Sequence, residues 1–357
     1  MHLRVVFAIH TPGQAHLWSN IIKTLISRGH NVFVLSRGGG ITEEILSKRN
    51  IQYTVYGRSG NTVYSKLLHL PSQFISCLRL INRFHPDIIV GSGILEAHVS
   101  ATLRKPCIIF EDTEVTPTLE RIQWQLTANT IISPSCFQRD LGKKHIRVKS
   151  YKELAYLHPD HFKPDTSIFK ELGIEPDGKY VIIRFNAFKA IHDIGEHGFS
   201  IAEKHAIVKE LEKYVTVFIS AEGPLAKGFD TYRLPTSPHR IHQVLNYAQL
   251  IVADSGTMTV EAAVLGTPGI NCQPKFGYLG NAIEIENKYG LVYIILEPKK
   301  AIAKAIELIQ QPDLKEQWAQ KRKQLLADKV NMAELMVDFI ENYPGSIAKF
   351  KKHVGAR

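Results

Sequence analysis

The sequence predicts an α/β fold with two doubly wound parallel sheets, one in each half of the chain. Short apolar segments typical of buried strands alternate with helical segments from residue 3 to residue 135. An irregular stretch rich in Pro, Asp and His follows from residue 149 to about residue 179, and the alternation then resumes. The chain has 357 residues, 44% of them hydrophobic, which is enough for two domains that each bury a core.

The first half shows the alternation most clearly. Apolar runs predict strands at residues 3–9, 31–36, 51–57, 87–93, 107–112 and 130–135. Helical segments lie among them at residues 17–29, 41–50 and 64–84. We expect the first helix to end at Gly29, because glycine readily adopts the left-handed conformation that closes a helix.

The second half repeats the pattern. Further strand and helix signals lie at residues 180–186, 215–223, 239–245, 250–256, 260–266, 269–273, 291–296 and 301–309. A charged helical tail covers residues 314–343. We therefore expect a first domain over 1–160, a linker over 161–178, a second domain over 179–325 and a helical segment over 326–357.

The composition indicates a globular protein with an anionic ligand. The formal net charge is +10, which suits a nucleotide sugar or an anionic membrane surface. Nucleic acid is not expected as a partner, because the basic residues form no long cluster. The apolar runs fall short of the ~18 residues that span a bilayer, and the start lacks a signal-peptide pattern. We expect a cytoplasmic protein, with peripheral contact at the inner membrane face left open; the sequence specifies no oligomeric state.

Residues 251–268 predict an anion site. A short apolar strand leads into Asp254, Ser255, Gly256 and Thr257, and a helical stretch then ends at Gly266. The first turn of a helix has unpaired N–H groups and the positive end of the dipole, which favour a phosphate. Glu261 lies about one turn further on and could bind a ribose. The alternative is that Ser255 and Thr257 only cap the helix and that Glu261 is an acid placed favourably near its start.

The segment D-S-G-T-M-T-V-E-A-A-V-L-G-T-P (254–268) resembles D-S-G-G-x-Q-E-E-A-P-x-L-G-x-P of the non-hydrolysing UDP-N-acetylglucosamine 2-epimerases. It is also similar to the donor-binding segment of GT-B glycosyltransferases, and residues 238–248 resemble the element before that turn. The resemblance implies that Ser255, Gly256 and Thr257 hold a diphosphate and that Glu261 holds the ribose. It further implies a GT-B-like fold, in which two Rossmann-like domains face a cleft and the C-terminal segment packs back on the first domain.

The chain also resembles the domain of unknown function 354 family. The similarity rests on YKELAYLHPDHFKPD, IIRFNAFKAIHDIGEHG, ADSGTM and FIENYP. That family has no settled activity, so the resemblance implies architecture rather than chemistry.

Three further loops follow strand ends, where ligands bind in such sheets. The loop 10–16 resembles the first loop of GT-B transferases and makes His16 a candidate base, or else a helix-start residue with a structural hydrogen bond. Asp112 and Glu114 lie in a run of acids that raise one another's pKa, although exposed acidic turns are common. Arg184 and Asn186 are candidate nucleotide-binding residues, with Arg184 on the diphosphate or in a surface ion pair.

No metal site is expected. His192 and His197 are separated by five residues, which does not place both rings on one helical face. The four cysteines form no C-x-x-C pair, so neither a zinc site nor a disulfide framework is indicated. We expect no cofactor beyond the nucleotide sugar itself.

The epimerases use three acids of the first domain for proton transfer. When the two sequences are aligned, only one of these acids has a counterpart in this chain. Glu111 matches, whereas the other two positions fall near Ile94 and near Pro117–Thr118. The sequence therefore favours a GT-B-type glycosyltransferase that uses a UDP-sugar and a glycan or lipid-linked acceptor in glycan or surface-polysaccharide synthesis. Asp112 or Glu114 is the first choice of base and His16 the next. The alternatives are a diverged 2-epimerase or hydrolase and a non-catalytic nucleotide-sugar-binding protein.

Overall fold

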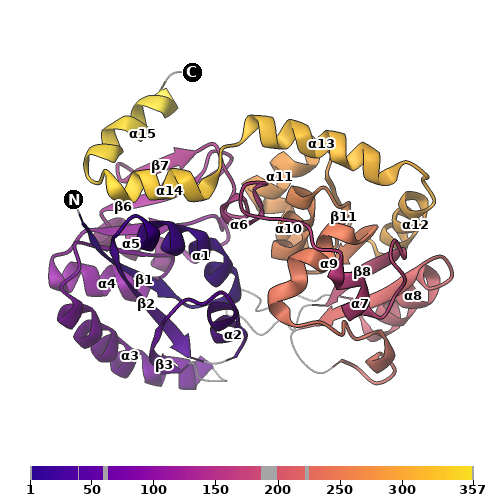
Figure 1. Ribbon diagram of the computed structural model, residues 1–357, viewed down its shortest axis with the longest axis horizontal. Coiled ribbons are helices and arrows are strands. Elements are labelled where there is room, and N and C mark those ends of the chain that lie inside the picture. Colours follow the sequence, from indigo (N-terminus) through magenta and orange to yellow (C-terminus); the bar gives the residue numbers. More distant parts are fainter. Residues whose placement is uncertain (1, 39, 59–62, 186–198, 222–224, 356–357) are drawn as a thin grey trace. The chain divides into compact units, whose positions relative to one another are not determined.

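The computed structural model describes residues 2–38, 40–58, 63–185, 199–221 and 225–355. The chain divides into two compact units, which are treated separately below (Figure 1). The first unit is Met1–Tyr156 with Val330–Arg357, and the second is Leu157–Lys329. Each has a fully parallel sheet, so the prediction of an α/β fold with two parallel-sheet domains is confirmed.

In the described residues of the first unit, the sheet has seven strands in the order β3-β2-β1-β4-β5-β6-β7. Every neighbouring pair is parallel. The strands are β1 (Arg4–Ile9), β2 (Asn31–Gly38), β3 (Thr54–Arg58), β4 (Ile88–Gly91), β5 (Cys107–Phe110), β6 (Thr130–Pro134) and β7 (His145–Val148).

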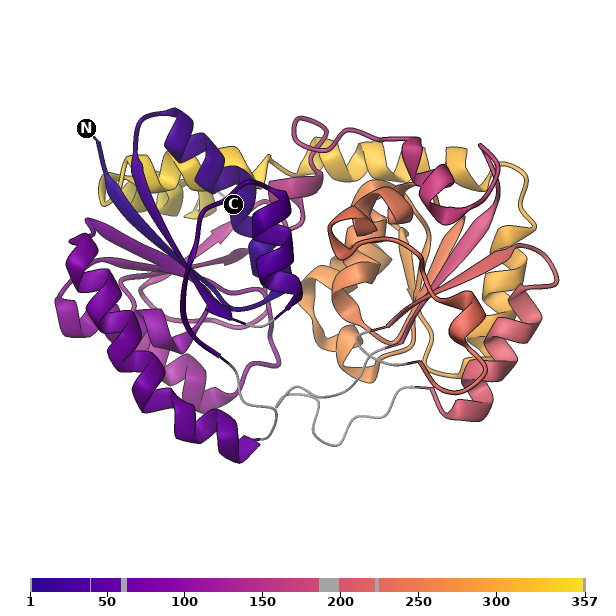
Figure 2. The ribbon, with the colours of Figure 1, turned by 60° about the horizontal axis from the view of Figure 1, so that its bottom comes forward.

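Helices cover both faces of this sheet (Figure 2). Alternate residues of a strand point to opposite faces, so Val6 packs with Cys77 and Ile81 of α3, whereas Phe7 contacts Trp18 of α1. The helices are α1 (Pro12–Ser27), α2 (Ile41–Lys48), α3 (Val63–Phe84), α4 (Ile94–Leu103), α5 (Thr118–Thr127), α6 (Leu154–Leu157), α14 (Met332–Glu341) and α15 (Gly345–Gly355). The first helix ends at Ser27 and is followed by Gly29 with φ +85°, which confirms the predicted cap.

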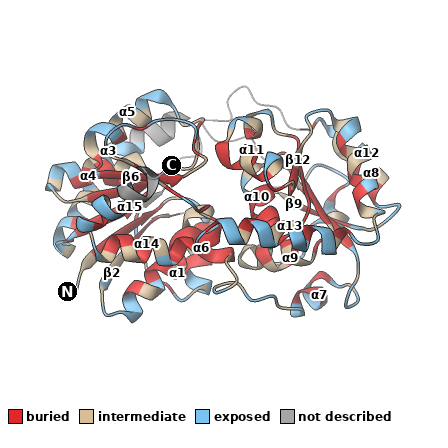
Figure 3. Ribbon diagram, turned by 90° about the horizontal axis from the view of Figure 1, so that it is seen from above, coloured by how far each residue is buried: buried red, intermediate tan, exposed pale blue. Residues whose placement is uncertain are grey.

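In the second unit, the described residues form a five-stranded sheet in the order β12-β11-β10-β8-β9. Its strands are largely buried, as the red ribbons of Figure 3 show. They are β8 (Tyr180–Phe185), β9 (Thr216–Ala221), β10 (Leu250–Ala253), β11 (Gly269–Asn271) and β12 (Val292–Ile294). The helices are α7 (Ser167–Leu172), α8 (Ile201–Leu211), α9 (Ile241–Tyr247), α10 (Gly256–Leu265), α11 (Gly280–Asn287), α12 (Pro298–Ile309) and α13 (Leu314–Asp328), with short 3-10 turns at Asp230–Tyr232, Pro238–Arg240 and Pro274–Tyr278. The segment 161–178, expected as a linker, contains α7.

The charged helical tail expected over 314–343 consists of two helices, α13 and α14, and α15 follows it. Helix α13 ends in the second unit. Val330, which follows it, donates its N–H to the carbonyl of Lys149 at 3.0 Å. Asn331 then starts α14, because its Oδ1 accepts the N–H groups of Ala333 and Glu334. Capping by Asn331 thus restarts the helix after a break that the charge pattern does not reveal.

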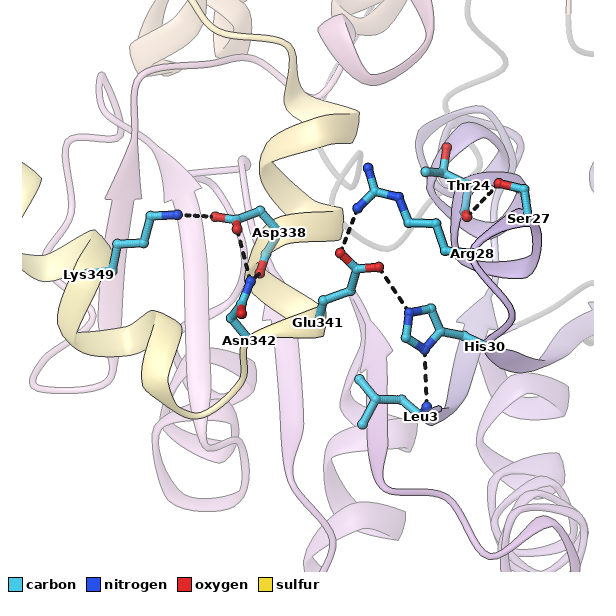
Figure 4. A network of polar contacts seen from close by, with 9 residues as sticks. All are labelled: Leu3, Thr24, Ser27, Arg28, His30, Asp338, Glu341, Asn342 and Lys349. Atoms are coloured by element: carbon cyan, nitrogen blue, oxygen red, sulfur yellow. Dashed lines mark hydrogen bonds and ion pairs between the residues drawn. The ribbon is translucent and has the colours of Figure 1, made fainter. Parts of the chain in front are cut away.

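Helix α14 packs on α1 in the first unit. Glu341 of α14 accepts hydrogen bonds from Arg28 Nη1 at 2.6 Å and from His30 Nε2 at 2.9 Å (Figure 4). The other nitrogen of His30 accepts the N–H of Leu3 at 3.1 Å, so His30 joins the residue before β1 to α14. Within the described residues, none of the helices combines the length and the apolar character that crossing a bilayer requires.

Replacing Gly266 with alanine should lower the free energy of unfolding by about 2 kcal/mol. Gly266 ends α10 with φ +82°, a conformation that costs an L residue ~1–2 kcal/mol. A Cβ there would also lie 2.9 Å from Cδ of Arg322, whose Nε donates to the carbonyl of Val264. Gly173 is a matched control, because its φ is +68° and an added Cβ meets nothing within 4 Å. Urea denaturation should show a smaller loss for Gly173→Ala; equal losses would remove the Arg322 contact from this explanation.

Candidate functional site

The strand order of each sheet defines where a ligand is expected. In a doubly wound sheet, ligands bind beyond the carboxyl ends of the strands, at the point where the strand order reverses direction. In the first unit this point lies between β1 and β4, and in the second it lies between β8 and β10. Both points carry polar side chains, and each unit therefore has a candidate site of its own.

In the first unit, His10 and Glu96 meet at this point. His10 directly follows β1, and Glu96 lies in the first turn of α4, after β4. His10 Nε2 is 2.9 Å from Glu96 Oε2, and His10 Nδ1 is 2.7 Å from the hydroxyl of Tyr56. Gln14 fixes the backbone of the histidine, because its Oε1 accepts the His10 N–H at 2.7 Å.

Two glycines make room for this pair. A Cβ on Gly91 would lie 2.0 Å from Glu96 Oε1, and a Cβ on Gly93 would lie 3.1 Å from both Glu96 Oε2 and His10 Nε2. The N–H of Gly93 also donates to Glu96 Oε1 at 2.6 Å. The segment Gly91-Ser92-Gly93 thus leaves room for the buried carboxylate of Glu96 to contact the imidazole of His10.

The electrostatics of the pair fix the positions of its protons. Burial opposes ionisation of Glu96, but the charge and hydrogen bond of His10, with backbone N–H groups, outweigh it, so the pKa of Glu96 lies below its usual value. Burial, followed by the charge of Glu96, raises the pKa of Tyr56, which therefore keeps its proton. The ionised Glu96 can only accept, so Nε2 of His10 donates to it, and Nδ1, beside the Tyr56 hydroxyl, is the ring nitrogen that can exchange a proton.

Two more carboxyl groups belong to this edge of the sheet. Burial, aided by the charge of Asp112, raises the pKa of Glu111 well above its usual value, although its Oε1 accepts the N–H of Thr113. Burial, aided by Glu96, also raises the pKa of Glu120 in the first turn of α5, and His10 opposes this effect. Side chains whose pKa values are shifted in opposite directions are typical of proton-transfer sites.

The acids chosen first from the sequence are engaged in other contacts. Asp112 forms an ion pair with Lys152, with Oδ2 and Nζ 2.6 Å apart. Glu114 is buried, and its Oε1 accepts the N–H of Gln138 at 3.2 Å. Glu114 therefore holds the loop that follows β6.

His16 lies in α1 rather than in a loop. The helix begins at Pro12 because Thr11 caps it, so His16 falls in its second turn and is buried. Its Nδ1 is 3.1 Å from a guanidinium nitrogen of Arg49, and its ring packs against Tyr156. The loop was identified correctly as a polar strand end, but His10, at its start, is the histidine that meets an acid.

In the second unit, the turn after β10 leads directly into α10. Of the described residues, Ser255 stands at the N-cap, and its side chain accepts no hydrogen bond from the first turn. Its carbonyl is held by Asn271 Nδ2 at 2.9 Å and by Thr259 Oγ1 at 3.0 Å. The turn is thus fixed from the neighbouring strand, and the helix N-terminus keeps the features that favour an anion.

Gly256 has a packing role beside the expected one, which stays a prediction. The sequence suggested that this glycine lets a ligand approach the backbone. In the structure, a Cβ on Gly256 would lie 3.0 Å from Cδ2 of Phe276 and 3.9 Å from Oε1 of Gln273. The glycine is therefore needed because the Phe276 ring packs against it.

Glu261 is paired within the protein. It lies in the second turn of α10 and is buried, and its Oε1 is 3.0 Å from Nε2 of His242 on α9, which is buried as well. His242 was not identified from the sequence. An intramolecular partner fixes the position of the carboxylate, which any ligand of Glu261 would meet already oriented.

Arg184 lies near the end of β8, beside the turn. Its carbonyl accepts the N–H of Asp254 at 3.2 Å, and its guanidinium Nη1 donates to Ser220 Oγ of β9 at 3.1 Å. Asn186 lies outside the described residues, as do His192, Asp193 and His197. Across the part of the chain that the structure describes, no group of three or more His, Cys, Asp or Glu side chains is placed to hold a metal ion.

Two acids lie a few residues from the positions at which the sequence comparison with the epimerases found none. The comparison placed these positions near Ile94 and near Pro117–Thr118. Glu96 and Glu120 lie two or three positions further along, in the first turns of α4 and α5, and both influence the same site. The first unit therefore has acids close to both positions, and a role for them in proton transfer is a proposal.

Comparisons with known proteins agree with this architecture. A family model described as "Protein of unknown function (DUF354)" matches residues 3–344. An uncharacterised protein of Methanocaldococcus jannaschii is 23% identical over 281 residues, which cover 73% of this chain and 79% of that protein. The structure of UDP-GlcNAc 2-epimerase from Neisseria meningitidis bound to UDP-GlcNAc has a TM-score of 0.65 at 14% identity, over 95% of this chain and 100% of that one. The calicheamicin glycosyltransferase CalG4 has a TM-score of 0.59 at 13% identity, over 97% and 99%. The predicted resemblance in fold to both enzyme groups is confirmed.

Proposed function

The chain belongs to the DUF354 family, and from this premise we propose that it is a glycosyltransferase that uses a nucleoside-diphosphate sugar, with UDP-sugars as the favoured donors. The observation that carries the proposal is the His10–Glu96 pair at the point where the strand order reverses. An imidazole with one nitrogen held by a carboxylate is suited to take a proton from a hydroxyl. The similar folds of UDP-GlcNAc 2-epimerases and glycosyltransferases support a nucleotide-sugar substrate.

The second unit is proposed to bind the nucleotide. The diphosphate lies on the N–H groups of Gly256 and Thr257, where the dipole of α10 favours negative charge. The Glu261 carboxylate accepts hydrogen bonds from the hydroxyl groups of the ribose, and His242 orients the carboxylate. Arg184 supplies positive charge at the same edge of the sheet. These groups stabilise the nucleoside diphosphate as it leaves, and we propose no resident metal for this step.

The first unit is proposed to supply the base. The acceptor hydroxyl gives its proton to Nδ1 of His10, directly or through the Tyr56 hydroxyl, while Glu96 stabilises the imidazolium that forms. The acceptor oxygen bonds to the anomeric carbon of the sugar as the bond from that carbon to the diphosphate breaks. His10 replaces Asp112, Glu114 and His16 as the proposed base, because it pairs with a carboxylate at the point where the strand order reverses, whereas Asp112 is paired with Lys152, Glu114 holds the loop after β6 and His16 is buried in α1.

A second candidate function is epimerisation at the sugar, and a specific observation favours it. Glu120 interacts electrostatically with Glu96 and His10, and also with Glu111, and the raised pKa values of Glu111 and Glu120 favour acids that can donate and accept protons. The two functions use the same nucleotide-binding residues. They differ in whether an acceptor is required.

Incubation with UDP-sugars, followed by NMR of the nucleotide and the sugar, tests the proposal. A transferase should release UDP only when an acceptor is added. An epimerase should produce the 2-epimer of UDP-N-acetylglucosamine without an acceptor. A hydrolase should release UDP and free sugar when water is the only acceptor. Binding of UDP without turnover of any donor, with or without glycan and lipid-linked acceptors, would overturn both enzymatic proposals and leave a binding protein.

Replacing Glu261 with alanine should weaken UDP binding by about 1–3 kcal/mol, the range for loss of a charge-assisted hydrogen bond. Isothermal titration calorimetry measures the change. Glu261→Gln is the matched control for folding, because the amide can still pair with His242. Both variants should be compared by melting temperature first. Unchanged UDP affinity in a folded Glu261→Ala protein would remove Glu261 from the nucleotide site.

A further inference from the structure

Helix α5 of the first unit has an exposed apolar face. Leu119, Ile122 and Leu126 are 68%, 46% and 75% exposed, and their spacing of three and four residues places them on one side of the helix. The opposite side contains Trp124, which is buried in the core with Ala97 and Ile109. The helix is therefore anchored by one side and presents leucine and isoleucine with the other. Figure 3 shows exposed residues along α5. A contiguous exposed apolar face of this kind is typical of an interaction surface.

Basic side chains flank this apolar face. Arg121 lies on α5, where its Nη2 donates to the hydroxyl of Thr118 at 2.9 Å, and Arg139 is exposed in the loop that follows β6. Lys144 donates its amine to the carbonyls of Gln125 and Leu126 at the end of α5. Lys143 is exposed next to it.

The C-terminal helix adds to this basic border. Lys351 of α15 donates to the carbonyl of Lys143 at 2.7 Å, and α15 packs on β7. Lys349 of the same helix is more than half exposed and forms an ion pair with Asp338, with Nζ and Oδ2 2.6 Å apart. The basic border thus combines two segments that lie more than 200 residues apart in the sequence.

We propose that the apolar face of α5 and its basic border bind the surface of a membrane that contains anionic lipids. Leucine and isoleucine insert at the boundary between headgroups and acyl chains, and arginine and lysine attract anionic headgroups. A second copy of this chain fits less well, because a twofold contact through α5 would place Arg121 and Arg139 against their own counterparts. The net charge of +10 suggested contact with an anionic membrane, and this surface is where we propose that the contact occurs. This contact requires no turnover, so it is independent of the proposed function.

Flotation of the full chain with lipid vesicles tests this proposal. The protein should float with vesicles of phosphatidylcholine and phosphatidylglycerol, float much less with phosphatidylcholine alone, and be released by salt. The double variant Leu119→Ser with Leu126→Ser should bind the anionic vesicles at least about tenfold more weakly, because apolar area no longer enters the interface. The variant Arg139→Glu with Lys143→Glu should lose the preference for anionic vesicles.

The matched control is Ile26→Ser with Leu70→Ser, which removes two exposed apolar side chains elsewhere in the same unit. It should float like the parent protein. Circular dichroism confirms that each variant is folded. The proposal is overturned if the parent does not float with anionic vesicles, if the α5 variant floats equally well, or if sedimentation shows a dimer that the α5 variant dissociates without any effect of lipid.

Discussion

If the protein catalyses the proposed glycosyl transfer, His10→Ala should lower the turnover number by roughly 10²–10⁴-fold, the usual contribution of a general base. The reason is that the acceptor hydroxyl must lose its proton as the new bond to the sugar forms, and Nδ1 of His10 is the nitrogen of the His10–Glu96 pair that can exchange a proton. Binding of UDP, which we assign to the second unit in the proposal, should not change. The measurement is steady-state turnover with calorimetry of UDP binding on the same preparations.

The control variants separate the role of His10 from a general effect of losing a histidine. His69→Ala removes an exposed histidine from α3 and should leave turnover within a few-fold of the parent. Glu96→Gln should lower turnover by a smaller factor than His10→Ala, because the amide can keep the ring in place but cannot stabilise the imidazolium. Asp112→Asn and Glu114→Gln should have lesser effects. Full activity in His10→Ala, or a larger loss in Asp112→Asn, would place the base elsewhere.

The free energy of unfolding should fall by about 3 kcal/mol between pH 6.5 and pH 4 because of His145 alone. Burial, aided by Arg147, lowers the pKa of this histidine from 6.5 to about 4, and Asp140 opposes the effect only partly. The ring is held neutral, since its Nδ1 accepts the N–H of Leu141 and its Nε2 is 2.5 Å from the buried hydroxyl of Ser133. Each pKa unit corresponds to about 1.4 kcal/mol.

The sign of this effect follows from proton binding. Below pH 6.5 the unfolded chain binds a proton at His145 that the folded protein does not bind until about pH 4, so acid favours unfolding. The contribution is fully present above pH 6.5 and is lost as the pH falls to about 4. Urea denaturation at a series of pH values should show a flatter decline for His145→Gln than for the parent, whereas His69→Gln should follow the parent. Parallel curves for His145→Gln and the parent would contradict the assignment.

The fold could be predicted where local sequence determines an element. Runs such as Val5–Ile9 are buried on both faces of a parallel sheet, and their continuous apolar character is visible without any tertiary information. Helix α4 was not predicted because polar residues occupy every second position from Glu96 to Thr102, which is the period of a strand rather than of a helix. Helix α5 was not predicted because three apolar residues face solvent, against the usual pattern.

The candidate site could be predicted only where its residues are contiguous. The turn at Ser255 was located correctly at the start of α10, because strand, turn and helix follow one another within a few residues. His10 and Glu96 are 86 residues apart, and only the pairing of β1 with β4 brings them together. The spacing Gly91-Ser92-Gly93 with Glu96 three positions later is a local signal that could have suggested the seat of a buried carboxylate. No comparable signal links His242 to Glu261, which lie on different helices.

Hydrogen–deuterium exchange with and without millimolar UDP is the most direct test of the central claim, that the N-terminus of α10 binds the diphosphate of a nucleotide sugar. Amide hydrogens at Gly256 and Thr257 should exchange more slowly with UDP, because they would donate to phosphate oxygens instead of to water. The peptide containing Glu261 should also be protected, and β7 of the first unit should be unchanged. Unaltered exchange at residues 255–261 in the presence of UDP, or protection confined to other segments, would contradict the account.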